Sequence, residues 1–121
     1  MPKFIKFEDD WTSSRNRIPD HCHDPIENYL IHGYEPGGFL TAVLSNDLFT
    51  AVGRADHINS ASLSNIALWI ANNAPQGSWG SYERVQAWCK DVDGRRTSFA
   101  DPIKKAHMWE ILSNRHEVTH D

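Results

Sequence analysis

One segment of this chain matches a pattern that is typical of zinc peptidases. Residues 116–120 read HEVTH, in which two histidines one helical turn apart would bind the metal and the glutamate would activate the metal-bound water. Zinc peptidases place this pattern inside a buried helix and take a third ligand from further along the chain, whereas only Asp121 follows it here. We therefore expect no catalytic residues and no metal at this end, and keep a metal-dependent hydrolase as the alternative function.

A second cluster of metal-binding residue types, HCHD, lies at residues 21–24. In an extended segment His21 and His23 would point the same way. Cys89 or His107 could then complete a zinc site. The second C-x-x-C or H-x-x-H half that structural zinc sites use is missing, so we expect no bound metal. We interpret the two histidines as partly exposed loop residues and His107 as a core histidine.

A more diffuse group of residues could bind an anionic ligand that contains a ring. Gly37 and Gly38 open a predicted helix, whose free N–H groups and positive dipole end suit a phosphate or carboxylate. Arginine side chains could pair with the anion, while Tyr34 or Trp79 stacks on a base. The candidate ligand-binding residues are Gly37, Gly38, Arg54, Trp79, Ser81, Arg95 and Arg96. The competing interpretation is that the two glycines form only a tight connector and that Trp79 covers the core.

The charge pattern argues against a nucleic-acid binder. The formal net charge is −4, so the surface is not globally basic. A recognition helix needs cationic or amide side chains beside the groove, yet no Lys or Arg lies between Arg54 and Arg84. We therefore do not expect sequence-specific DNA binding.

The composition also bears on where the protein acts. No apolar run approaches the roughly 18 residues of a membrane span, and the N-terminal sequence MPKFIKFEDDW is too charged for a signal peptide. Cys22 and Cys89 could form one disulfide, but nothing requires it. We expect a cytoplasmic protein without a membrane partner or a cofactor.

Residues that typically start and end helices predict an all-α fold. Residues 1–20 form an arm that could contain one edge strand, and residues 21–121 form one helical domain whose last residues fray. Asp24 at the N-cap and Pro25 after it predict a first helix, which Gly33 ends in a left-handed conformation. The length of the chain, 121 residues, fits a compact single-domain bundle of about five to six short helices.

Further helices are predicted from apolar stripes and capping residues. A second helix should cover residues 39–45, and Asp47 should cap a third over residues 48–55. The alternative is one continuous helix in which Asp47 falls on the apolar face. Ser81 should cap another helix, residues 91–94 read as a turn, and the Asp-Pro pair at residues 101–102 predicts the start of the last helix.

The predicted helix over residues 61–73 is unusual because it is uncharged. No Asp, Glu, Lys or Arg occurs between residues 58 and 82. A helix with so few polar groups is normally central or faces a partner subunit. We therefore expect a homo-oligomer.

The sequence resembles a widespread family of small proteins from tailed bacteriophages and prophages. Residues 33–56 read GYEPGGFLTAVLSNDLFTAVGRAD, and the resemblance covers a PGGFLTAVLSND block, a GRAD turn, an apolar helix and a WGS helix start within residues 18–91. The resemblance implies a bacteriophage source. It also implies an accessory protein that acts by binding, in counter-defence or host takeover within the cytoplasm of the bacterial host. Two forms stay open: sequestration of a nucleotide-like signal, or inhibition of a host protein through an apolar helix or the arm.

Overall fold

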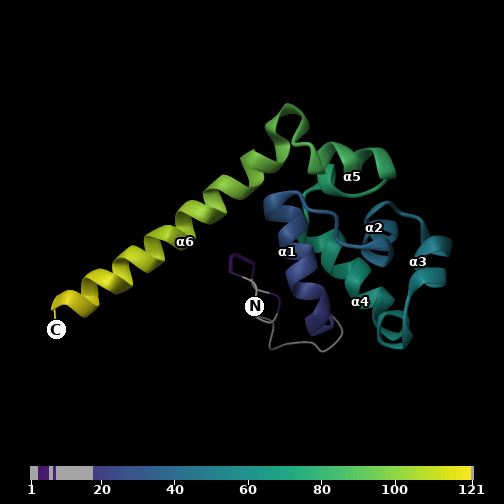
Figure 1. Cartoon of the computed structure of the whole chain (residues 1–121), viewed down its shortest axis with the longest axis horizontal. Coiled ribbons are helices and arrows are strands. Elements are labelled where there is room, and N and C mark those ends of the chain that lie inside the picture. Colours follow the sequence, from purple (N-terminus) through teal and green to yellow (C-terminus); the bar gives the residue numbers. More distant parts are fainter. Residues whose placement is uncertain (1–2, 6, 8–17, 121) are drawn as a thin grey trace.

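The structure, a computed structural model, describes residues 3–5, 7 and 18–120, with side chains through residue 107. Its described part contains helices and no strand, which confirms the predicted all-α fold. The helices are α1 (His23–His32), α2 (Gly38–Leu44), α3 (Leu48–Arg54), α4 (His57–Asn73), α5 (Tyr82–Cys89) and α6 (Arg95–His120). In the described part, three short 3-10 segments accompany them: Asp20–Cys22, Gln76–Ser78 and Val92–Gly94. In Figure 1, α1 to α5 form the bundle and α6 runs away from it.

Helix α1 begins before the residue predicted to cap it. The 3-10 segment Asp20–Cys22 leads directly into it, so Cys22 occupies the N-cap position and offers no side-chain cap. Asp24 therefore lies in the first helical turn, and the prediction that it caps the helix was wrong. The backbone is already helical at that residue. Gly33 ends the helix with φ 77°, as predicted.

Helices α2 and α3 are separate, as predicted, and the continuous alternative is excluded. Asn46 adopts a left-handed φ of 62°, which interrupts the helical path. Asp47 then caps α3, because its carboxylate accepts a hydrogen bond from the N–H of Thr50.

Helix α4 starts four residues before the predicted start at residue 61. Asp56 caps it by accepting a 2.7 Å hydrogen bond from the N–H of Asn59. The cap lies in the GRAD turn, where Asp56 already has extended backbone geometry. Ser81 caps α5 as predicted, through the N–H of Arg84.

The predicted start of the last helix at residues 101–102 was wrong. Helix α6 begins at Arg95 and contains Pro102 in its interior. Asp91, four residues before the helix, caps its first turn. The Asp91 carboxylate accepts a 3.0 Å hydrogen bond from the N–H of Thr97 and a second bond from the Thr97 hydroxyl.

Packing explains why the helix tolerates Pro102. Ala100 is fully buried, and the Phe99 ring packs on Trp88 with 5.8 Å between ring centroids. Burial of this turn therefore outweighs the local preference for a helix start at an Asp-Pro pair.

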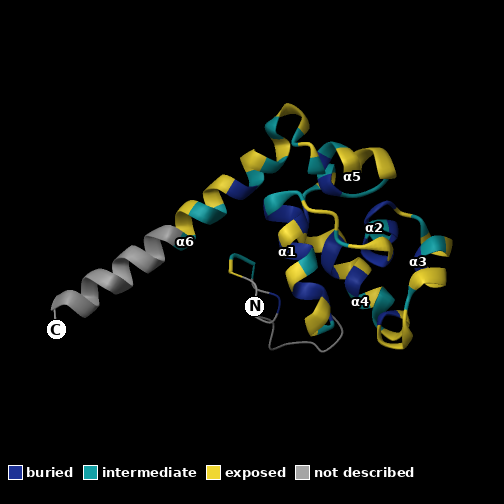
Figure 2. Cartoon of the chain, viewed as in Figure 1, coloured by how far each residue is buried: buried dark blue, intermediate teal, exposed yellow. Residues whose placement is uncertain are grey.

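The core surrounds α1. Figure 2 shows buried residues along α1 and on the neighbouring faces of α2 and α4. Tyr29 lies at its centre, where its hydroxyl donates a 2.6 Å hydrogen bond to the Ser78 carbonyl. Its own carbonyl accepts from Nε1 of Trp88 on α5. These bonds join segments distant in sequence, so they hold α5 and the 3-10 segment Gln76–Ser78 against α1.

A buried carboxylate holds the arm. Glu27 on α1 accepts hydrogen bonds of 2.6–2.8 Å from the N–H groups of Lys3, Phe4 and Ile5. These arm residues form no strand, and residues 8–17 lie outside the described part. The docked arm places Phe7 over the core.

The helices of the described part show no membrane-spanning candidate. None combines the length and the apolar character that crossing a bilayer requires.

Candidate ligand pocket beside Arg54

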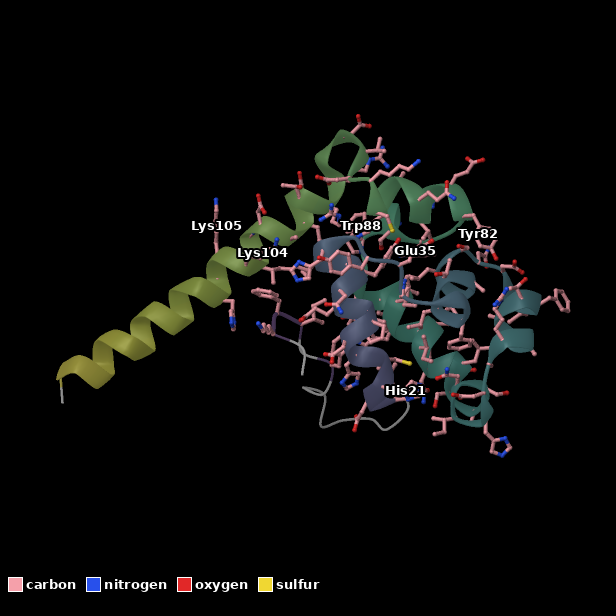
Figure 3. All side chains as sticks on the ribbon, in the orientation of Figure 1. His21, Glu35, Tyr82, Trp88, Lys104 and Lys105 are labelled. Carbon is pink, nitrogen blue, oxygen red and sulfur yellow. The ribbon has the colours of Figure 1, made fainter. Side chains whose placement is uncertain are left out.

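A pocket of about 390 Å³ opens where the start of α2 meets α3 and the start of α5. Tyr82 contributes from α5 and Glu35 from the loop before α2; both are labelled in Figure 3. The lining residues are Glu35, Gly37, Gly38, Thr41, Thr50, Arg54 and Tyr82. Three of the predicted ligand-binding residues, Gly37, Gly38 and Arg54, therefore meet at one site.

Arg54 lies across the first turn of α2. A Cβ atom on Gly38 would stand 3.0 Å from Nη1 of Arg54, so the absence of a side chain there admits the guanidinium. Within the described residues, no hydrogen bond or ion pair engages this guanidinium. Among the described residues, therefore, no acidic side chain forms an ion pair with this charge, although Glu35 also lines the pocket.

Gly37 occupies the N-cap position of α2 without capping it by a side chain. Its φ of 91° is left-handed, a conformation that favours glycine. The first hydrogen bond of the helix joins the N–H of Thr41 to the Gly37 carbonyl at 2.9 Å. The preceding N–H groups are therefore left to solvent or to a bound group.

A hydrogen-bond network fixes the opposite wall of the pocket. The Tyr82 hydroxyl donates a 2.6 Å bond to Oδ2 of Asp47, whose Oδ1 accepts from the N–H of Thr50. The bond from Tyr82, followed by those from Thr50, lowers the pKa of Asp47. The same bond to Asp47 raises the pKa of Tyr82, against the smaller opposing effect of the Arg54 charge. The phenol is therefore held neutral, and its orientation is fixed.

Trp79 and Ser81 lie in the turn before α5 and do not line this pocket. Nε1 of Trp79 donates to the Ala74 carbonyl at 3.2 Å. Ser81 caps α5. The aromatic ring that the pocket contains is that of Tyr82, one residue further along the chain.

Arg95 and Arg96 also lie away from the pocket. Nε of Arg96 donates to the Trp88 carbonyl and Nη1 to the Ile31 carbonyl, both at 3.2 Å. This side chain therefore joins the C-terminal ends of α5 and α1. The Arg95 side chain lies beside Gly77, 3.6 Å from where a Cβ would be.

Four lining residues were not among the sequence predictions: Glu35, Thr41, Thr50 and Tyr82. The spacing of Thr50 and Arg54, four residues apart on one helix, could have indicated that they share a face. Tyr82 carried no such signal, because only the packing of α5 against α2 brings it to the pocket.

The HCHD cluster is not arranged as a metal site. Nε2 of His21 donates to Oδ1 of Asn59 at 2.7 Å, and the described residues contain no group of three metal-binding side chains. The prediction that both histidines are partly exposed was wrong for His23. Its ring is buried against Phe7, with centroids 4.5 Å apart, and donates to the Ile18 carbonyl. The His23 ring is buried because Phe7 of the arm stacks on it.

The remaining candidate residues, the two cysteines and His107, do not form one site in the described part of the chain. Cys22 and Cys89 are both free thiols, and burial raises the pKa of Cys22 to about 11. His107 is half-buried rather than a core residue, because it packs on the arm at Phe4, 4.9 Å between centroids. The side chains of the HEVTH pattern at residues 116–120 lie outside the described part of the chain.

Comparison of the chain with protein-family models, with curated proteins and with solved structures found no significant match.

Proposed function

We propose that this protein acts by binding a small anionic, nucleotide-like molecule in the pocket beside Arg54. The observation that carries the proposal is the Arg54 guanidinium, which faces a pocket of about 390 Å³ and has no ion-pair partner among the described residues. Small-molecule sites occupy roughly 300–1,000 Å³, so the volume suits a mononucleotide-sized ligand. In keeping with the phage resemblance, the biological role would be counter-defence or host takeover.

The lining offers each part of such a ligand a matching group. The guanidinium can bind two oxygens of a phosphate or carboxylate in parallel. The Tyr82 ring, which its bond to Asp47 holds in place, offers a flat face for a base. Thr41 and Thr50 contribute hydroxyls for the polar edge of the ligand. Glu35 adds a negative charge at the rim, which favours ligands that also carry a donor group.

Calorimetric titration with a panel of mono- and dinucleotides tests the proposal. We expect wild type to bind at least one of them, with an affinity that falls as salt rises. Arg54→Ala should abolish binding together with its salt dependence. Arg95→Ala removes the same charge outside the pocket and is the matched control.

Gly38 provides a second probe of the same site. Its backbone is not left-handed, whereas Gly37 has φ 91° and would be strained by any side chain. Gly38→Val would push the flexible Arg54 side chain aside and should weaken binding while the protein stays helical by circular dichroism. If no nucleotide binds wild type, or if Arg54→Ala and Arg95→Ala behave alike, this function is rejected and inhibition of a host protein takes its place.

A further inference from the structure

Helix α3 presents large apolar side chains to solvent. Leu48, Phe49 and Val52 are 58%, 89% and 53% exposed, and we call these three residues the α3 apolar face. Val52 lies four residues after Leu48 and three after Phe49, so its side chain neighbours both and joins them in one patch. An almost fully exposed phenylalanine beside two other exposed apolar side chains is typical of a surface that a partner covers.

A groove borders this face. It has a volume of about 260 Å³ and lies between the α2–α3 connection and α4. Its lining is mainly apolar and consists of Val43, Asn46, Asp47, Leu48, Ala51, Leu63, Ser64 and Ala67. Leu48 belongs both to the groove and to the α3 apolar face, so a projecting ring, Phe49, and a hollow that could receive one are next to each other.

The charges around this surface favour a second copy of the chain as the occupant. Each copy carries a formal net charge of −4, so two copies repel each other through most pairs of faces. Neither residues 48–53 nor residues 57–82 contain an Asp, Glu, Lys or Arg. Helix α4 therefore exposes only neutral residues beside the groove, such as Ser64, Ala67 and Leu68. Asp47 is the one charged residue among those lining the groove, and its carboxylate already accepts hydrogen bonds from the Tyr82 hydroxyl and the Thr50 N–H. Two copies can therefore approach here with fewer like charges together than at a charged face.

We propose that two copies of this chain associate about a two-fold axis through the α3 apolar face and the adjoining groove, with Phe49 of each copy in the groove of the other. A two-fold interface requires one surface that carries both complementary features, which this one does. The Phe49 rings would form the buried centre. The neutral face of α4 would extend the contact toward the roughly 800 Å² per copy that a standard interface buries.

Sedimentation equilibrium over a range of concentrations tests the proposal. Wild type should pass from the 13.8 kDa monomer to a dimer as its concentration rises. Phe49→Asp loses the central contact twice in a two-fold dimer, so the dissociation constant should rise at least about a hundredfold. Tyr34→Asp is the matched control: Tyr34 is 64% exposed and does not line the groove, so the dimer should persist.

A mixing experiment tests the two-fold arrangement itself. Ala67→Trp fills the groove, so this variant should be monomeric, as Phe49→Asp should be. A mixture of the two variants should form a heterodimer. It keeps one intact contact, because Phe49 of the Ala67→Trp chain can enter the open groove of the Phe49→Asp chain. Circular dichroism confirms that both variants are folded.

Three results would overturn the proposal. The first is a wild type that stays monomeric at millimolar concentration, which would leave the surface for a different protein. The second is a dimer that Phe49→Asp does not weaken. The third is a mixture of the folded variants that stays monomeric. Phe49 does not line the pocket beside Arg54, so nucleotide titration of Phe49→Asp separates failure of the dimer from failure of the proposed ligand site.

Discussion

The regions around α1 and α3 differ in how far their aromatic side chains are exposed to solvent. Beside α1, the chain covers its own aromatic surface: Trp69 is 8% exposed because Phe7 of the arm packs on it, with 4.9 Å between ring centroids. On α3, Phe49 is 89% exposed. One apolar surface belongs to the core, and the other is open to solvent.

The arginines show the same contrast. Arg96 donates to the carbonyls that end α1 and α5, so its charge serves the fold. Arg54, at the end of α3, has no hydrogen bond or ion pair within the described residues and faces a pocket. The α1 side therefore uses its aromatic and cationic groups within the fold, whereas α3 leaves Phe49 and Arg54 exposed, which fits the binding roles proposed above.

Exchanging the two phenylalanines for alanine should give the largest contrast. Phe7→Ala opens a cavity over Trp69 and His23, and we expect it to lower the free energy of unfolding by about 3–5 kcal/mol. Phe49→Ala should change it by less than about 0.5 kcal/mol. Urea unfolding checks both, at a concentration where the chain is monomeric so that association does not contribute. Equal losses would remove the distinction between the two surfaces.

Glu27→Gln should have the next largest effect. The substitution removes the charge that three backbone N–H groups share, and we expect a loss of about 1.5–3 kcal/mol. Hydrogen exchange at the amides of Lys3, Phe4 and Ile5 should accelerate, which shows that the arm has undocked. Glu83→Gln, on the exposed face of α5, is the control. Unchanged exchange in Glu27→Gln would mean that other contacts hold the arm.

Two arginine substitutions sharpen the comparison at a smaller magnitude. Arg96→Ala leaves the Ile31 and Trp88 carbonyls without this donor, so we expect a loss of about 1–2 kcal/mol and no change in ligand affinity. Arg54→Ala should leave the stability unchanged and lower the ligand affinity. Thermal unfolding and calorimetric titration of both variants give the answer, and a pair that affects both properties equally would contradict it.

Substitution of the capping carboxylates should have the smallest effect on stability. The effect should be similar for Asp91, before α6, and for Asp47, before α3. Hydrogen bonds from the Thr97 side chain and backbone lower the pKa of Asp91, and bonds from Tyr82 and Thr50 lower that of Asp47. A carboxyl with a depressed pKa in the folded state adds stability above its unfolded pKa, near 3.9, which is lost as the pH falls through the folded value.

Asp91→Asn and Asp47→Asn should therefore each make stability less dependent on pH in acid. Urea unfolding between about pH 5 and pH 2 measures this. Because both side chains are only partly buried, the change should be small. A variant with the same acid dependence as wild type would show that its carboxylate contributes nothing.

Several helix ends could be predicted because their causes are local. Gly33, Asp47 and Ser81 act on N–H or carbonyl groups within a few residues of themselves, so residue type and position suffice. The two Asp-Pro pairs misled the prediction for a related reason. Each falls inside a helix that starts earlier, and those starts depend on a 3-10 turn in one case and on Asp91 in the other.

The candidate pocket could be predicted only in part. Gly37 and Gly38 mark a helix start by sequence alone, and Arg54, Arg95 and Arg96 were the arginines expected to contribute to the site. Which arginine lies there is decided by how α3 folds back on α2, and which ring lies there by how α5 packs beside them. Ser81 and Tyr82 are neighbours in sequence, yet only Tyr82 points to the pocket.

The sequence by itself determined the helical fold, most of its boundaries and the absence of charge along α4, since each of these depends on residue type and short-range order. Only the tertiary structure decided which side chains have partners. Phe7 and Trp69, or Arg96 and Ile31, lie about 60 residues apart or more and meet through packing of the whole chain. Burial and pairing are properties of that packing, so the exposed ring of Phe49 and the lack of an ion-pair partner for Arg54 among the described residues could not be recognised from spacing.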